Sequence, residues 1–172
     1  MKTTQTPREF QPTGRRRSGR AQNPEIEDPY MSGKKLAEPS ACPGCGAVYR
    51  KGRWHWPELP DKSSTPVLCA ACHRIAEKLP AGTLTIGGAY VGSHGDEMMN
   101  LINHQVEQEK KEHPMNRVMG VERSADKIVI TTTDIHLPRR IGRALNKAHH
   151  GKLDMTYDAD AYAVRVNWHR DK

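Results

Sequence analysis

The chain has 172 residues, of which 35% are hydrophobic and only one is phenylalanine. This suffices for one ordinary domain, or for a small metal-stapled module beside a compact α+β domain of about 90 residues. No apolar run is long enough to span a membrane, and the N-terminus lacks the apolar segment of a signal peptide. We therefore expect a cytoplasmic protein without a membrane partner. The net charge of +7 favours an acidic polymer as partner.

The first forty residues form a polar segment that contains many Pro, Gly and Ser residues and few aliphatic ones. Such a segment cannot bury enough apolar surface to offset its ordering entropy. The composition predicts a disordered basic tail over residues 1–40. Its cations cluster at Arg15, Arg16, Arg17 and Arg20. A solvated tail and an arm that folds along an RNA groove are both consistent with this cluster.

Four cysteines are arranged as two close pairs, Cys42 with Cys45 and Cys69 with Cys72. In a reducing compartment such pairs are metal ligands more often than disulfides. Two residues between thiolates allow both sulfurs to reach one tetrahedral ion. The spacing predicts a bound Zn²⁺ in a module over residues 41–80, with an iron site or four reduced cysteines as alternatives. Four thiolates leave no position for a reactive water, so the predicted metal is structural.

The residues around the cysteines indicate the type of module. Residues 49–56 are typical of one arm of a hairpin, and residues 73–79 are typical of a short helix that follows the second cysteine pair. The glycine after Cys45 permits the tight turn of a zinc knuckle. Knuckle, hairpin and helix predict a treble-clef finger, with a zinc ribbon as the close alternative. His73 fits solvent or an RNA phosphate better than the metal.

Residues 81–172 show alternating strand-like and helix-like patterns. The periodicity and the turn residues predict, in chain order, a strand, a helix, a hairpin, a second helix and a second hairpin. The expected ranges are 83–91, 96–112, 117–123 with 127–133, 136–150, and 152–157 with 161–169. This order predicts the α+β class, with an antiparallel sheet covered on one face by two helices.

Within the cysteine module, cationic and aromatic residues alternate at Arg50, Lys51, Arg53, Trp54 and His55. This combination neutralises phosphates while a ring stacks on an exposed nucleobase. Packing of the tryptophan in the small core of the module is the alternative. We expect the segment to contact RNA.

The second predicted helix carries a basic stripe. His136, Arg140, Arg143 and Lys147 follow one another at i, i+4, i+7 and i+11, and Arg139 flanks them. A charged helix face is usually only solvated, but this stripe lacks the interspersed acids of a salt-bridged surface. The pattern favours phosphate binding.

Catalytic patterns are weak in this sequence. The glycine-rich residues 87–95 lack a Walker lysine and the spacing of a dinucleotide fingerprint, so we expect glycine bends at a strand end. No acid is placed to orient Ser93 and His94. Asp134 and His136 are expected to begin the second helix, with the aspartate as its cap. We therefore predict that the chain is not an enzyme.

The paired cysteines and residues 127–168, above all residues 131–143, resemble the N-terminal part of the archaeal and eukaryotic large-ribosomal-subunit export adaptor family. They resemble more closely a set of short bacterial proteins of unassigned function. The resemblance covers about residues 41–169 and implies a role in binding the ribosome or ribosomal RNA, with the four cysteines matching the zinc-binding part. The adaptors carry more cysteines and further domains, so export is not implied.

These observations give one preferred hypothesis and two alternatives. The preferred one is a zinc-stabilised RNA-binding protein that associates with the ribosome in assembly, hibernation or quality control. The second is a zinc-dependent DNA-binding or regulatory adaptor protein, with which the charge is equally consistent. An enzyme of nucleotide or RNA metabolism is the weakest, because the sequence offers no cluster of catalytic groups.

Overall fold

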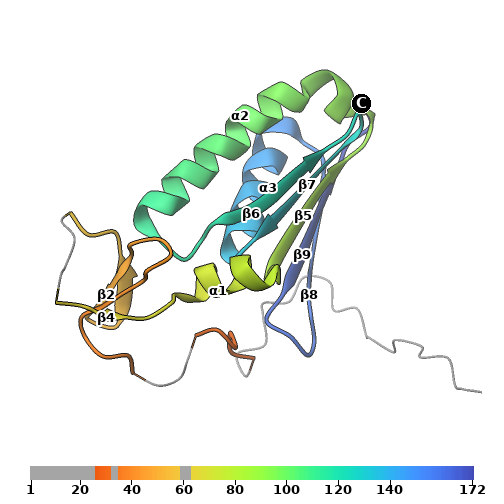
Figure 1. Cartoon of the computed structure of the whole chain (residues 1–172). Helices are drawn as coiled ribbons and strands as arrows, with labels where there is room; N and C mark the ends of the chain where they lie inside the picture. Colours follow the sequence, from red (N-terminus) through yellow and green to blue (C-terminus); the bar gives the residue numbers. More distant parts are fainter. Residues whose placement is uncertain (1–25, 32–34, 59–62) are drawn as a thin grey trace, which may run out of the picture.

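The computed structural model describes residues 26–31, 35–58 and 63–172. In this part of the chain, three helices accompany two β-sheets, so the predicted α+β class is confirmed (Figure 1). The smaller sheet comes first and has the strand order β3-β2-β1-β4, and the larger sheet has the order β6-β7-β5-β9-β8. Within the described ranges, no helix is long and apolar enough to cross a membrane.

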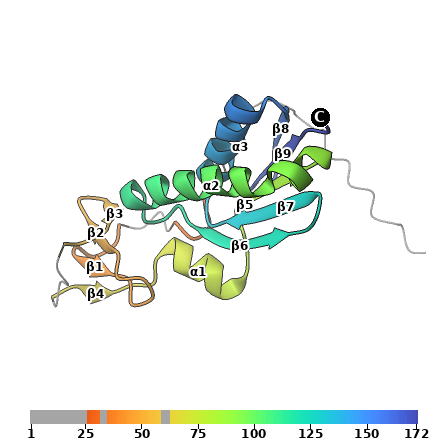
Figure 2. The ribbon, with the colours of Figure 1, turned by 90° about the horizontal axis from the view of Figure 1, so that it is seen from above.

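The smaller sheet and the helix after it contain the cysteine pairs. Their bounds are β1 (Ser40–Ala41), β2 (Val48–Arg50), β3 (Arg53–His55), β4 (Thr65–Pro66) and α1 (Ala70–Glu77). The first strand pairs antiparallel with β2 and parallel with β4. Viewed from above, these elements lie beside the end of the larger sheet (Figure 2).

The larger sheet and its two helices form the second half of the chain. Their bounds are β5 (Gly82–Gly87), α2 (Ala89–Glu112), β6 (Val118–Arg123), β7 (Lys127–Thr132), α3 (His136–His149), β8 (Lys152–Tyr157) and β9 (Val164–His169). The two hairpins, β6 with β7 and β8 with β9, are antiparallel. The central strand β5 is antiparallel to β7 but parallel to β9. The sheet is therefore mixed, and the prediction of an antiparallel sheet is wrong at this pair.

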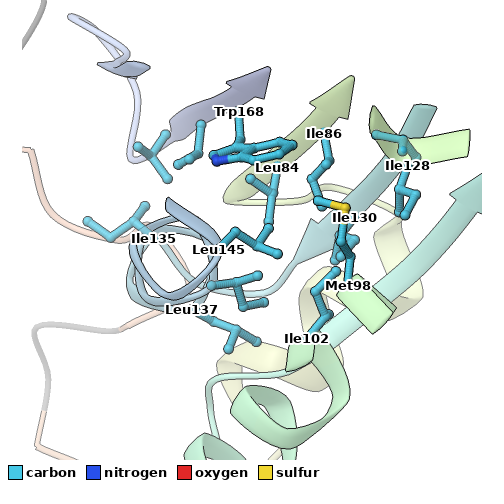
Figure 3. Packing of buried hydrophobic residues seen from close by; sticks show 14 of the residues in the cluster. Leu84, Ile86, Met98, Ile102, Ile128, Ile130, Ile135, Leu137, Leu145 and Trp168 are labelled. Atoms are coloured by element: carbon cyan, nitrogen blue, oxygen red, sulfur yellow. The ribbon is translucent and has the colours of Figure 1, made fainter. Parts of the chain in front are cut away.

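The main core lies between one face of the larger sheet and the helices α2 and α3 (Figure 3). Alternate residues of β5, β7 and β9 point to the helices, as the period of a strand requires. Buried side chains from sheet and helices include Leu84, Ile86, Met98, Ile102, Ile128, Ile130, Leu137, Ile141, Leu145, Val166 and Trp168. Both helices therefore cover the same face.

The boundary between β5 and α2 differs from the prediction. The strand ends at Gly87 and the helix begins at Ala89, so the predicted strand is too long and the predicted helix too short. Gly88 separates them with a φ of 109°, and a Cβ atom there would lie 2.1 Å from the carbonyl oxygen of Arg170. Val91, which suggested a strand, is buried against the sheet from the first turn of the helix. The expected glycine bends are therefore the start of α2.

Part of the predicted tail packs against the cysteine module. Asp28 accepts a 2.5 Å hydrogen bond from the buried guanidinium of Arg74 in α1. Ser40 is fully buried in β1, and the carboxylate of Glu38 accepts the backbone N–H of Lys51. The expectation of a disordered segment up to residue 40 therefore does not hold for residues 26–31 and 35–40.

Candidate metal centre and nucleic-acid surface

The structure brings the four predicted metal ligands together. The sulfur atoms of Cys42, Cys45, Cys69 and Cys72 all lie within 4.8 Å of one another, and none forms a disulfide. The sulfurs of Cys45 and Cys69 are 3.8 Å apart. Four sulfurs about 2.3 Å from a central ion, at the corners of a tetrahedron, would be about 3.8 Å apart. The donor set and its spacing therefore fit one tetrahedral metal ion.

The first cysteine pair lies in a tight turn between β1 and β2. The backbone N–H of Cys42 donates to the carbonyl oxygen of Ala47 at 2.8 Å, and that of Gly46 donates to the carbonyl oxygen of Cys42 at 2.8 Å. Gly46 has a φ of 79°, a conformation that a residue with a Cβ atom rarely adopts. The glycine after the second cysteine thus allows the tight turn that the sequence predicted at this position.

The second pair lies at the N-terminus of α1, where Cys69 is the N-cap. Its sulfur accepts the backbone N–H of Cys72 at 3.4 Å, and its own N–H donates to the sulfur of Cys42 at 3.3 Å. Burial opposes ionisation, but backbone donors outweigh it and lower the pKa of Cys42 to about 7. Burial raises the pKa of Cys45 and of Cys69. Backbone donors therefore favour the thiolate at Cys42, whereas burial favours the protonated thiol at Cys45 and Cys69.

Arg117, immediately before β6, contacts the metal site from the second half of the chain. Its Nη2 atom lies 3.3 Å from the sulfur of Cys69 and 3.3 Å from that of Cys72. Its backbone is fixed by Thr133, whose N–H donates to the Arg117 carbonyl oxygen at 2.9 Å. Desolvation opposes the charge of the guanidinium, but the hydrogen bond to Cys72 and the other thiolates raise the pKa of Arg117. Four thiolates around a divalent ion would leave excess negative charge, and this arginine lies where it would offset that charge.

The sequence reasoning missed Arg117. It lies 45 residues after Cys72, and no motif connects the two positions. The pairing of β6 with β7 and the backbone hydrogen bonds to Thr133 hold it beside the cysteines. A contact of this kind has no signal in local residue patterns.

Residues 48–55 form a complete hairpin, rather than the single arm predicted for residues 49–56. Its two-residue turn, Lys51 and Gly52, has positive φ at both positions, as a type I′ hairpin turn requires. Trp54 is half-buried and lies edge-on against Tyr49, with ring centroids 5.5 Å apart. The other members of the predicted RNA-contacting segment are exposed: Arg50, Lys51, Arg53 and His55.

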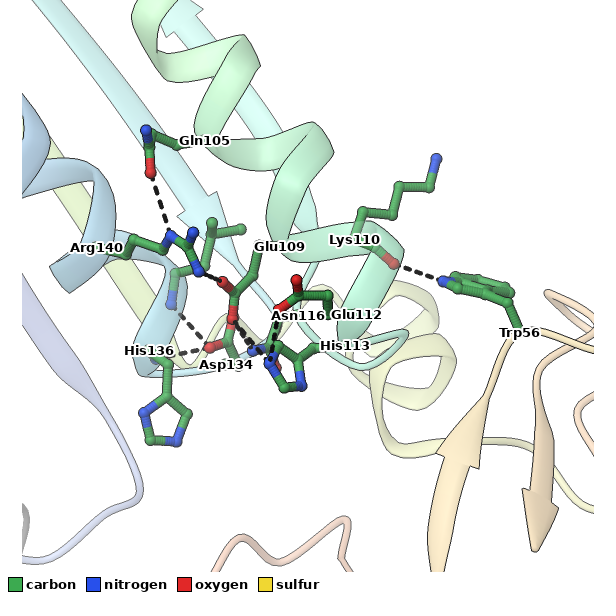
Figure 4. Close-up of polar contacts among 11 residues, drawn as sticks. Trp56, Gln105, Glu109, Lys110, Glu112, His113, Asn116, Asp134, His136 and Arg140 are labelled. Carbon is green, nitrogen blue, oxygen red and sulfur yellow. Dashed lines mark hydrogen bonds and ion pairs between the residues drawn. The ribbon is translucent and has the colours of Figure 1, made fainter.

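Trp56 connects this hairpin to the C-terminal end of α2. Its indole N–H donates to the carbonyl oxygen of Lys110 at 2.5 Å (Figure 4). A hollow of about 520 Å³ lies at this junction. The residues that line it are Cys45, Trp56, Glu107, Lys110, Lys111 and Arg117. The cysteine cluster, the residue after the hairpin, the end of α2 and Arg117 therefore surround one cationic hollow.

The basic stripe predicted on α3 is interrupted by partners from α2. Arg140 pairs with Glu109 at 2.5 Å and donates to Gln105 at 3.1 Å (Figure 4). Burial and the charge of Arg139 lower the pKa of His136, so its ring is a poor phosphate ligand. The acid that the sequence pattern lacked thus comes from another helix.

The remaining cations of the predicted stripe differ in their surroundings. The guanidinium carbon of Arg139 lies 5.6 Å from the ring centroid of Tyr157. Arg143 and Lys147 are exposed further along α3. The predicted cations of the N-terminal segment, Arg15, Arg16, Arg17 and Arg20, lie outside the described residues.

Asp134 caps α3, as the sequence predicted. Its Oδ2 atom accepts the backbone N–H groups of His136 at 2.6 Å and Leu137 at 2.9 Å, while its buried Oδ1 atom has no partner. Burial, supported by the nearby charge of Glu109, raises the pKa of Asp134 to about 6 against the opposing effect of the two backbone donors. Asp134 and Glu109 are both more than nine-tenths buried. These carboxylates stabilise the helix junction and do not form a metal site with nearby histidines within the described residues.

Comparison with known proteins does not identify the site, so its chemistry is argued from its geometry. No protein-family model, curated protein or solved structure matches the chain. The resemblance to the ribosomal export adaptors therefore stays a prediction from the sequence.

Replacing Arg117 with methionine is expected to weaken binding of added Zn²⁺ by about 10- to 100-fold, the range found for outer-shell partners of metal ligands. The change removes two N–H···S contacts and one positive charge. Competition against a chromophoric chelator measures the affinity. Arg123→Met is the matched control, because that arginine is paired with Asp96 at the other end of β6. Equal affinity of both variants would contradict the assigned role.

Asp134→Asn is expected to flatten the pH dependence of stability. A native pKa of about 6, above the ordinary value of about 4, means that the folded state holds this proton more tightly than the unfolded chain. Stability from this group is therefore present at low pH and is lost as pH rises from about 4 to 6, by on the order of 2–3 kcal/mol. Asparagine keeps the cap without the buried charge.

Urea unfolding of the wild type and of Asp134→Asn between pH 4 and 8 measures this effect. The variant should match or exceed the stability of the wild type above pH 7, and it should lose its advantage at pH 4. Parallel pH profiles for the two proteins would show that Asp134 does not titrate in this range.

Proposed function

We propose that this chain is a zinc-stabilised RNA-binding protein. The order of knuckle, hairpin and helix around the four cysteines supports a treble-clef finger. Zn²⁺ is the metal that four thiolates at tetrahedral spacing suit best. The closed coordination sphere supports a scaffold role, in which the metal holds the β2–β3 hairpin and α1 in place. The exposed side chains of this scaffold, rather than the metal, contact the RNA.

The observation that carries the proposal is the cationic hollow at the junction. Its lining combines the indole of Trp56 with Lys110 and Lys111, and Glu107 is the one carboxylate in the lining set. The exposed cations of the hairpin, Lys51 and Arg53, precede the indole in the chain. Cations that follow a backbone, together with rings on which bases stack, are the common elements of single-strand binding surfaces.

The exposed side chains of α1, the helix of the cysteine module, favour unpaired RNA over duplex DNA as the ligand. A helix that reads the major groove presents polar or basic side chains to the bases. In α1, Arg74 is buried and paired with Asp28, and the exposed positions include Ile75 and Glu77. The cations lie instead on the hairpin and on α2. A ribosome-associated, cytoplasmic role in assembly, hibernation or quality control is the finer proposal, and it is based on the sequence resemblance.

Binding to single-stranded RNA, duplex RNA and duplex DNA across a range of salt concentrations tests the proposal. The double variants Lys51→Ala/Arg53→Ala and Lys110→Ala/Lys111→Ala should each weaken RNA binding by about tenfold and reduce its salt dependence, because each removes two phosphate partners. The control Lys127→Ala/Lys152→Ala removes the same charge at the opposite end of the larger sheet.

Three outcomes would count against the proposal. Tighter binding to duplex DNA than to RNA would favour the DNA-binding alternative. Equal losses in the control and test variants would show that only the net charge matters. Sedimentation wholly in the ribosome-free fractions of a low-salt sucrose gradient would contradict the ribosomal role but not RNA binding.

A further inference from the structure

A second hollow lies on the inner face of the β2–β3 hairpin and is unusually aromatic. It has a volume of about 250 Å³, and the rings of Tyr30, Tyr49, Trp54 and His73 line it together with aliphatic side chains such as Leu68. The chain has nine Trp, Tyr and Phe residues in total (3 Trp, 5 Tyr and 1 Phe), and three of them meet here. A purely structural role for Trp54, as part of the small core, would not explain why three of these rings surround an open hollow.

The rings are held in place by their own elements. Tyr49 and Trp54 are cross-strand partners in the hairpin, with ring planes at 61° to each other. On the opposite side, the guanidinium carbon of Arg74 lies 4.5 Å from the ring centroid of Tyr30, whose hydroxyl donates to Glu77. These contacts fix the rings before any ligand binds, which lowers the entropy cost of binding.

The size of the hollow suits a planar heterocycle. A cavity of about 150 Å³ is enough for benzene, so about 250 Å³ admits a larger flat ring system. Flat ligands gain most from stacking on aromatic faces, and the stacking is tolerant of base identity. The hydroxyl groups of the tyrosines and the ring of His73 offer polar atoms for the edge of such a ligand.

The charges around the hollow favour a nucleotide over a cationic ligand. Gly52 is part of its lining, and the exposed cations Lys51 and Arg53 flank this glycine. Three carboxylates near the hollow already have partners: Glu38 accepts the backbone N–H groups of the turn, Asp28 pairs with Arg74, and Glu77 accepts the hydroxyl of Tyr30. A methylammonium group would compete with these donors for a carboxylate, whereas the phosphate beside a bound base would meet the exposed cations.

We propose that this hollow binds one unpaired nucleobase of an RNA strand, stacked on the ring of Trp54 with the tilted ring of Tyr49 against its edge. The inference rests on the proposed RNA-binding function and extends it, because it assigns base contact to a pocket separate from the cationic hollow at the junction. At the junction, Lys110 and Lys111 contact phosphates beside the ring of Trp56, whereas binding in this second pocket depends on a base.

A thermodynamic cycle that combines a substitution in the full chain with removal of the bases from the ligand tests the pocket. One ligand is a single-stranded RNA, and the other is a sugar-phosphate oligomer of the same length that lacks the bases. The wild type should bind the RNA more tightly by about tenfold or more. Trp54→Leu should remove most of this difference, because only the ring of Trp56 then remains for stacking, while Trp54→Phe should keep most of it. Tyr49→Leu is the second variant in case Trp54→Leu does not fold.

The outcomes separate this inference from the proposed function. Equal, salt-dependent binding of both oligomers by the wild type would overturn the pocket and leave RNA binding intact. Equal losses for both oligomers in Trp54→Leu would show that this tryptophan is only structural. Failure to bind either oligomer would overturn both proposals. Competition by tetramethylammonium, but not by a nucleoside monophosphate, would identify a cationic ligand instead.

Discussion

The convergence of four thiolates is the interaction on which the first half of the structure depends. The small core around Cys42 and Cys69 has few apolar side chains, and the strands of its sheet are only two or three residues long. Such short elements are not stable by themselves. A metal ion held by the four cysteines would supply the missing free energy by joining the turn after β1 to the N-terminus of α1. The same cluster attracts Arg117, so it also joins this module to the larger sheet.

The position of the hairpin between two hollows follows from that arrangement. On one side, the indole N–H of Trp56 donates a hydrogen bond to the end of α2, and Lys110 and Lys111 lie beside the cysteine cluster. On the other side, Trp54 and Tyr49 face α1. An isolated short hairpin in water does not hold its side chains in fixed positions, whereas here the core around the cysteines and the end of α2 both contact the hairpin. A rigid surface of this kind loses less entropy when it binds a flexible strand.

Local patterns in the sequence predicted the features that depend on local spacing. In each of these features, the residues involved are close together in the sequence. Examples are the two residues between the cysteines of a pair, the apolar stripe of α3, the cap at Asp134 and the alternation in β9. Other features depend on contacts between distant segments, such as the bond of Arg117 to two thiolates, the pairing of Glu109 with Arg140, and the parallel alignment of β5 with β9. Periodicity shows which residues share a face, but it does not show which strands are neighbours.

Hydrogen exchange with and without a metal chelator tests most directly whether the metal organises the hairpin. Removal of the metal from the full chain should greatly accelerate exchange in β2, β3 and α1, because their hydrogen bonds have little apolar support. The strands β5, β7 and β9 should keep their protection, because their core is independent of the cysteines. A hairpin that stays equally protected after the metal is removed would contradict this account.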